Sequence, residues 1–342
     1  MARLPRYNPA DIFYDEYDVS MCERNDALGD NVGLYRTKTT KCGSGSGHIC
    51  EVDIYPVMKR GVRIEPQSGK TSKAQREVNH RNTQRKISQL LNANFCDSSN
   101  VYATFGYSEK YLPETFEEAT ANLINYLRKL KRLIKRVNEL ILETRQCKFD
   151  FMNERPRISI SEFEVALKEY GNSVGLKKNF GKIALYLAQN ADKQLEPLKY
   201  LYVTEMSQNG RFHHHFVTNF FDRDIIECFW KFGERNQTRR VKPDKDFGLA
   251  GLANYLSKDY GYKKDYEKSY GSSANLYRPY NYSTTSDTKA SKRQASGIAN
   301  DYAKAVSWFT RKYPNYVLLE APSVRTNNYF GGYWIYARLK RL

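Results

Sequence analysis

Residues 200–218, YLYVTEMSQNGRFHHHFVT, constrain the fold of this 342-residue chain more than any other stretch. Residues 200–205 are rich in Tyr, Leu, Val and Thr, which favour β-strands. A polar Ser-Gln-Asn-Gly segment follows at 207–210, and Asn-Gly is a strong hairpin signal. Residues 212–217 then form a second run flanked by apolar residues. The pattern predicts a β-hairpin.

Three of the five histidines in the chain stand together on the second predicted strand, as His213, His214 and His215. Alternate side chains of a strand share a face, so His213 and His215 point one way and His214 points the other. Glu205, on the preceding strand, could lie beside the pair. Two imidazoles and a carboxylate with open coordination positions can form a catalytic divalent-metal site. Two alternatives stay open: an incidental His-rich surface, and a role for His214 with its neighbours as mere flanks.

The charge of the chain points to a polyanionic partner. Its 55 Lys and Arg against 38 Asp and Glu give a formal net charge of +17. An acidic membrane surface is the competing partner, but no long apolar run could span a bilayer and no signal-peptide core follows Met1. We therefore expect a soluble cytoplasmic protein without a membrane partner. The 27 tyrosines also suit base stacking, although most would simply be half-buried.

Two predicted helices carry dense positive charge. Residues 72–92 present Arg81 and Arg85. The longest helical pattern follows Pro113, with apolar residues at alternating spacings of four and three from Leu123 to Ile141. Its other faces carry Arg128, Lys129 and Arg132. Such faces are usually only solvated, but the charge density favours contact with phosphates.

A short predicted helix within residues 251–262, GLANYLSKDYGY, offers a second chemical feature. Tyr255 and Lys258 are three residues apart and lie on one side of that helix. A tyrosine here is more often a packed aromatic residue, because a nucleophilic phenol needs a base, a cation or a metal nearby.

Together these segments resemble the HUH-type rolling-circle replication-associated (Rep) endonucleases of phages, plasmids and mobile elements, named for two histidines around a bulky residue. Residues 101–107, VYATFGY, are similar to the first family strand. Glu205, Gly210, His213 and His215 match the second motif, and Tyr255 and Lys258 match its Tyr-x-x-Lys helix. The three motifs occur in the family's order, which makes the resemblance stronger than any one of them.

The resemblance implies cleavage and rejoining of single-stranded or hairpin origin DNA by transesterification. Tyr255 would be the nucleophile and become a 5′-phosphotyrosine, with Lys258 assisting it. His213, His215 and Glu205 would hold Mg²⁺ or Mn²⁺. Tyr260 and Tyr262 are further candidates for a second nucleophile. The expected role is initiation of rolling-circle DNA replication in a bacterial host cell, with a host helicase and polymerase as partners.

The resemblance also implies an α+β fold with a ferredoxin-like central antiparallel sheet flanked by helices. We expect an irregular N-terminal arm at residues 1–50 and the endonuclease domain at 51–342. Residues 137–196 exceed the family's usual link, which makes that stretch a possible insertion. Residues 269–296 are rich in Ser, Tyr and Asn, and this composition predicts a surface excursion or a mobile segment. Two functional alternatives stay open: a mobilisation relaxase or transposase with the same chemistry, and a non-enzymatic nucleic-acid-binding protein.

Overall fold

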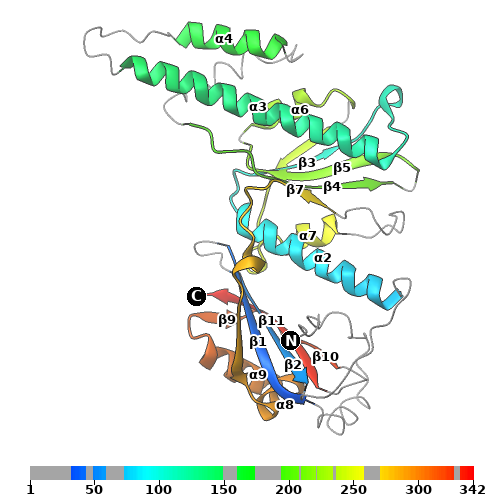
Figure 1. Ribbon diagram of the computed structural model, residues 1–342, viewed down its shortest axis with the longest axis vertical. Coiled ribbons are helices and arrows are strands. Elements are labelled where there is room, and N and C mark those ends of the chain that lie inside the picture. Colours follow the sequence, from blue (N-terminus) through cyan, green and yellow to red (C-terminus); the bar gives the residue numbers. More distant parts are fainter. Residues whose placement is uncertain are drawn as a thin grey trace, which may run out of the picture. The chain divides into compact units, whose positions relative to one another are not determined.

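The computed structural model describes ten segments of the chain, which are residues 32–43, 49–58, 73–148, 160–173, 194–207, 209–220, 222–233, 236–257, 270–326 and 332–342. The chain divides into two compact units (Figure 1). Unit 1 consists of Met1–Cys96, Lys242–Lys258 and Tyr277–Leu342, and unit 2 consists of Asp97–Val241 and Asp259–Leu276. The expected domain from residue 51 onward therefore covers parts of both units, because the chain crosses between them several times.

Unit 1 contains a six-stranded antiparallel sheet, in which five strands follow the order β10-β11-β2-β1-β8 and β9 also pairs with β11. The strands are β1 (Val32–Cys42), β2 (Ile49–Met58), β8 (Thr284–Ala290), β9 (Tyr316–Leu318), β10 (Ser323–Thr326) and β11 (Tyr333–Arg341). Segments from both ends of the chain are thus neighbours, with β11 hydrogen-bonded to β2.

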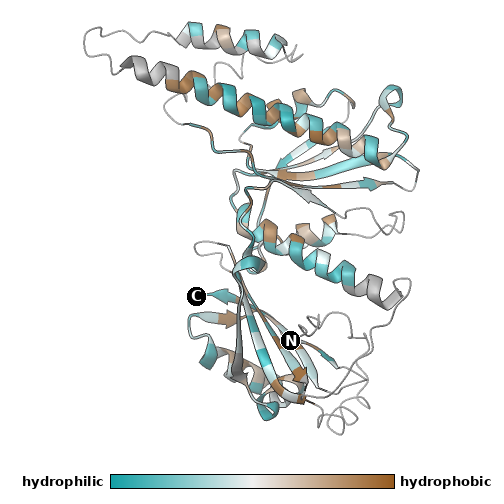
Figure 2. Cartoon of the chain, viewed as in Figure 1, coloured by the Kyte–Doolittle hydropathy of each residue, from teal (hydrophilic) through white to brown (hydrophobic). Residues whose placement is uncertain are grey.

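The two faces of this sheet differ because side chains alternate along each strand. Val52 and Ile54 of β2, with Ile335 of β11, pack in a core with α8 (Lys292–Asn300) and α9 (Tyr302–Lys312). The intervening residues of β2 face α2 (Lys73–Asn94), where Arg85 contacts Glu51 and Asp53. Figure 2 shows α2 as hydrophilic along much of its length, as a helix on a polar sheet face should be.

Unit 2 contains a five-stranded antiparallel sheet in the order β6-β3-β5-β4-β7. Its strands are β3 (Val101–Phe105), β4 (Tyr200–Met206), β5 (Phe212–Thr218), β6 (Gln237–Arg240) and β7 (Gly271–Ser272). The predicted hairpin is confirmed as β4 and β5, and Gly210 in its turn has a φ of 73°. The strand with the histidines, β5, is the central one.

The 33-residue helix α3 (Phe116–Lys148) lies across one face of this sheet (Figure 1). Its apolar stripe, including Leu123, Leu127 and Leu130, is buried against Phe105 and Phe216 of the strands. The hydrophilic residues between these positions are visible in Figure 2. The short helix α6 (Arg223–Phe229) completes this core and is capped by Asp222, whose side chain accepts a bond from the Ile225 N–H. Aspartate is among the residues preferred at this position, because its carboxylate satisfies an N–H group that has no partner within the helix.

Three expectations about chain organisation need correction. The arm at 1–50 is not irregular throughout, because β1 runs over Val32–Cys42 and pairs with both β2 and β8. The expected insertion boundary at 137 falls inside α3, and part of the insertion forms α4 (Ile160–Ser173). Residues 269–296 contain β7 and β8, separated by a short 3₁₀ helix, and the start of α8.

The mixed α+β class with antiparallel sheets is confirmed. None of the helices in the described segments is long and apolar enough to cross a lipid bilayer.

Candidate metal centre

Glu205, His213 and His215 meet on one face of the unit 2 sheet. Glu205 of β4 pairs directly with His213 of β5, and His215 lies two residues further along the same strand. The Glu205 Oε2 atom is 3.4 Å from His213 Nε2 and 3.6 Å from His215 Nε2. The three ligand atoms all lie within 4.8 Å of one another. The hairpin register therefore assembles the predicted cluster.

Two hydroxyl groups on β3 lie within hydrogen-bonding distance of the Nδ1 atom of His215. The Tyr102 phenol oxygen is 2.7 Å from His215 Nδ1, and the Thr104 hydroxyl is 3.1 Å from the same nitrogen. A metal-binding Nε2 needs the imidazole proton on Nδ1, which these oxygens can accept. Neither residue was predicted from the sequence. Their signal is the alternation along residues 101–107, which places Tyr102 and Thr104 on one face once β3 is known to pair with β5.

The electrostatics of the cluster suit a cation. Burial would raise the pKa of the Glu205 carboxyl, but hydrogen bonds and charge interactions with His213 and His215 outweigh it and lower that pKa to about 2. Burial lowers the pKa of His215, which favours the neutral imidazole that ligates metals. Glu205 is only 3% exposed, and its Oε1 atom has no hydrogen-bond partner among the described residues. A buried carboxylate oxygen without a partner is costly, and a bound cation would satisfy it. The residues present fit a divalent metal.

His214 has a different environment, on the opposite face of β5. Its side chain is fully buried, with Nε2 2.8 Å from the Tyr107 hydroxyl and Nδ1 3.0 Å from the Thr204 hydroxyl. Burial, followed by repulsion from the neighbouring histidines, lowers the pKa of His214 to about 3. His214 also contacts Trp230 edge-to-face. It is a neutral, hydrogen-bonded core residue, and the alternative that gave it the main role is not supported by its position.

The tyrosine motif belongs to the other unit. Tyr255 lies on α7 (Ala250–Leu256) of unit 1 and is 39% exposed. Lys258, Tyr260 and Tyr262 lie outside the described residues. The metal cluster belongs to unit 2. A reaction in which Tyr255 acts together with that cluster is therefore a proposal.

The predicted basic residues fall into two groups. Arg128, Lys129 and Arg132 lie on α3 of unit 2, where Arg128 and Arg132 are exposed. Burial, with the nearby charges of Lys231 and Arg132, lowers the pKa of Lys129, as expected within a cluster of cations.

Arg81 and Arg85 lie on α2 of unit 1. The prediction of phosphate contact does not suit Arg85, because its guanidinium is committed to two buried carboxylates. Its Nε is 2.6 Å from Glu51 Oε2, and Nη1 and Nη2 are each 2.7 Å from the Asp53 oxygens. Arg85 is therefore an internal counter-ion.

Comparison with known proteins adds no relative to this description. No protein-family model, curated protein sequence or solved structure matches the chain.

Proposed function

We propose that this chain is a metal-dependent nickase of the HUH type that cuts and rejoins single-stranded origin DNA to initiate rolling-circle replication. The observation that carries the proposal is the cluster of Glu205, His213 and His215 on a central antiparallel hairpin. Its donor set of two imidazoles and one carboxylate leaves coordination positions for a substrate. The order of motifs in the sequence and the net charge of +17 support the same function.

Glu205, His213 and His215 would hold Mg²⁺ or Mn²⁺. When bound, such an ion supplies Lewis-acid polarisation of a phosphate oxygen and offsets the charge that develops there. Tyr102 and Thr104 would keep the proton of His215 on Nδ1 and so orient Nε2 towards the ion. Glu205 would contribute its charge from a buried position, where the low local dielectric strengthens the attraction.

Tyr255 would attack the scissile phosphate in this proposal. Its phenol oxygen loses a proton and bonds to phosphorus, while the bond from phosphorus to the 3′ oxygen breaks. The 3′ oxygen takes up a proton and becomes the 3′-hydroxyl that primes synthesis. Lys258 would lower the pKa of the phenol or neutralise the phosphate. Because one phosphoester replaces another, the reverse reaction rejoins the ends without a nucleotide cofactor.

The proposal also covers the fold of unit 2 and the partners of the chain. We propose that unit 2, with its central histidine strand and the helix α3 on one face, is the ferredoxin-like endonuclease part of the chain. The substrate would be single-stranded or hairpin origin DNA in a bacterial host cell, with a host helicase and polymerase completing replication.

The test uses single-stranded oligonucleotides from the origin region, with Mn²⁺ and with EDTA, and detects a covalent protein–DNA band on denaturing gels. We expect a metal-dependent adduct that is lost in Tyr255→Phe and in His213→Ala. The matched control is Tyr277→Phe, which removes the hydroxyl of another exposed tyrosine of unit 1.

The other outcomes are equally informative. An adduct that survives in Tyr255→Phe would move the nucleophile to Tyr260 or Tyr262. Tight DNA binding without any adduct on either origin strand would refute the nickase and favour the non-enzymatic binding protein.

A further inference from the structure

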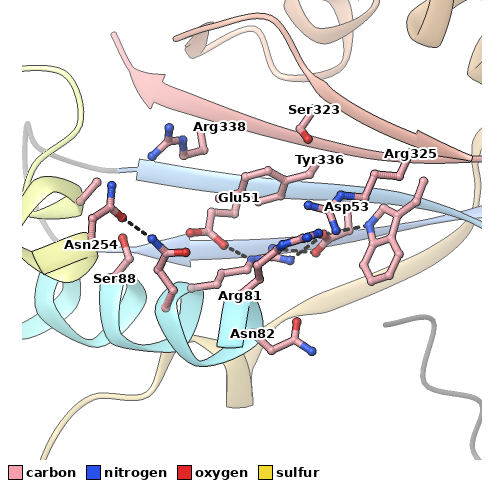
Figure 3. Close-up of a pocket in the computed structure, with 14 residues that line it drawn as sticks. Glu51, Asp53, Arg81, Asn82, Ser88, Asn254, Ser323, Arg325, Tyr336 and Arg338 are labelled. Atoms are coloured by element: carbon pink, nitrogen blue, oxygen red, sulfur yellow. Dashed lines mark hydrogen bonds and ion pairs between the residues drawn. The ribbon is translucent and has the colours of Figure 1, made fainter. Parts of the chain in front are cut away.

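Unit 1 contains a pocket of about 290 Å³ between α2 and the polar face of its sheet. Arg81 comes from α2, Arg325 from β10, and Trp334, Tyr336 and Arg338 from β11. Figure 3 shows Arg81 on the helix and Arg325 on the opposing strand. The volume is near the lower end of the range of about 300–1,000 Å³ for small-molecule pockets, which suits one small ligand.

The pocket has an excess of positive charge. Four arginines line it against two carboxylates, Glu51 and Asp53. Arg85 binds both carboxylates, and its single positive charge offsets one of their two negative charges. Arg338 pairs with Glu320, with Nη2 2.6 Å from Oε1.

Arg81 and Arg325 are the other two arginines that line the pocket. Burial, followed by the positive charge of Arg325, lowers the pKa of Arg81, and both side chains line the same pocket. An anion is the ligand that such a pair stabilises.

The same pocket contains aromatic surface. The half-buried Trp334 is oriented by its indole N–H, which lies 3.4 Å from Asp53 Oδ1. The Tyr336 ring is covered by the Arg85 guanidinium, 4.5 Å from its centroid. An indole beside two arginines matches a ligand with a phosphate and a flat base.

We propose that this pocket binds one nucleotide of a single strand of DNA, with its phosphate at Arg81 and Arg325 and its base against Trp334. The inference rests on the proposed function for the choice of DNA. One observation links it to that function: Asn254 of α7 also lines the pocket and accepts a 2.8 Å hydrogen bond from Gln84 of α2. Since Asn254 precedes Tyr255, the nucleotide lies at the helix that carries the proposed nucleophile.

The test measures binding of a fluorescent single-stranded oligonucleotide in EDTA, where no cleavage occurs, across a series of salt concentrations. The double variant Arg81→Gln, Arg325→Gln should bind about tenfold more weakly at moderate salt. The slope of log affinity against log salt should shrink by roughly 0.7 for each phosphate that the variant no longer neutralises. The matched control is Arg311→Gln, Lys312→Gln, which removes two charges from the exposed end of α9 outside the pocket. Equal losses of affinity in both double variants would overturn the site.

The base-stacking interaction needs its own test. Trp334→Leu should weaken oligonucleotide binding about tenfold, because base stacking contributes strongly to single-strand affinity. Its affinity for a heparin fragment, a polyanion without bases, should not change. If heparin and oligonucleotide binding weaken equally, the pocket is a plain anion site and the nucleotide proposal is wrong.

Two further readouts keep the result interpretable. Ultraviolet crosslinking of the oligonucleotide to the unaltered protein should place the adduct on the peptide containing Trp334, whether or not Trp334→Leu folds. A crosslink confined to other peptides would overturn the proposal. A free nucleoside triphosphate that competes as well as the oligonucleotide would also overturn it, since the ligand would then be a free nucleotide. If the unaltered protein binds the oligonucleotide in EDTA as expected but forms no covalent adduct with Mn²⁺, the nickase proposal is refuted and the nucleotide pocket is not.

Discussion

Tyr102→Phe is the substitution that tests the metal centre most selectively. It removes the hydroxyl that lies 2.7 Å from His215 Nδ1 and leaves the ring in place. Arg239, whose guanidinium carbon lies 4.7 Å from the Tyr102 ring centroid, can still stack on phenylalanine. The proposed ligands Glu205, His213 and His215 are untouched. Only the group that orients one ligand is removed.

The size of the effect follows from this geometry. Loss of a hydrogen-bonding group behind a metal ligand typically weakens metal binding about 10–100-fold, which is about 1.4–2.7 kcal/mol. Thr104 keeps a hydroxyl 3.1 Å from the same nitrogen and can replace part of the missing hydrogen bond. We therefore expect a loss of about tenfold, nearer the lower bound.

The assay is titration calorimetry with Mn²⁺ at neutral pH, combined with urea unfolding in EDTA. Tyr107→Phe is the matched control, because it removes a hydroxyl 2.8 Å from His214, on the other face of the same strand. We expect Tyr107→Phe to lower the free energy of unfolding by about 1–3 kcal/mol, since a buried nitrogen loses its partner. Its Mn²⁺ affinity should be unchanged. Equal Mn²⁺ affinity in Tyr102→Phe and the unaltered protein would refute the reasoning, and so would a loss of affinity shared by both variants.

Two predictions concern stability. The folded pKa of His214, about 3, is below its ordinary value of 6.5. The unfolded chain therefore takes up a proton first, and the free energy of unfolding should fall as the pH drops from about 6.5 towards 3, by at most about 1.4 kcal/mol per pH unit for this group. Urea unfolding in EDTA across that range should show a shallower dependence in His214→Gln, and an unchanged dependence would contradict the assignment. Arg85→Ala should cost about 3–5 kcal/mol at pH 7, because it leaves Glu51 and Asp53 buried without their counter-ion. The matched control Lys86→Ala, at an exposed position of the same helix, should change the free energy of unfolding by no more than about 0.5 kcal/mol.

Local chemistry made the centre of unit 2 predictable from sequence. Gly210, with a φ of 73°, lies in the turn between β4 and β5, and the hairpin register pairs Glu205 with His213. The period of two along β5 then separates His215 from His214. The capping Asp222 is likewise readable, because its bond closes within three residues. Each of these features depends on contacts between residues close in sequence.

The division into units could not be predicted because it depends on distant pairings. Strand β1 contains Thr and Lys at many positions and lacks an obvious apolar alternation. Its stability comes from β2 on one side and from β8, roughly 250 residues further along the chain, on the other. The same holds for β11 beside β2. The order of the motifs along the chain therefore favours one domain for Tyr255 and His213, whereas the contacts place them in two units.

Both sheets use the same physical device to combine stability with chemistry. In unit 2, Phe216 joins the core beneath α3 while His215, one residue earlier, joins the metal cluster. In unit 1, Ile335 packs in the core with α8 and α9, while Trp334 lines the pocket. A one-residue step along a strand thus exchanges a structural role for a chemical one. Substitutions at the chemical positions should therefore change binding with little loss of stability, and those at neighbouring core positions should do the reverse. His213 and His214, which share residue type and strand but not face, offer the sharpest comparison.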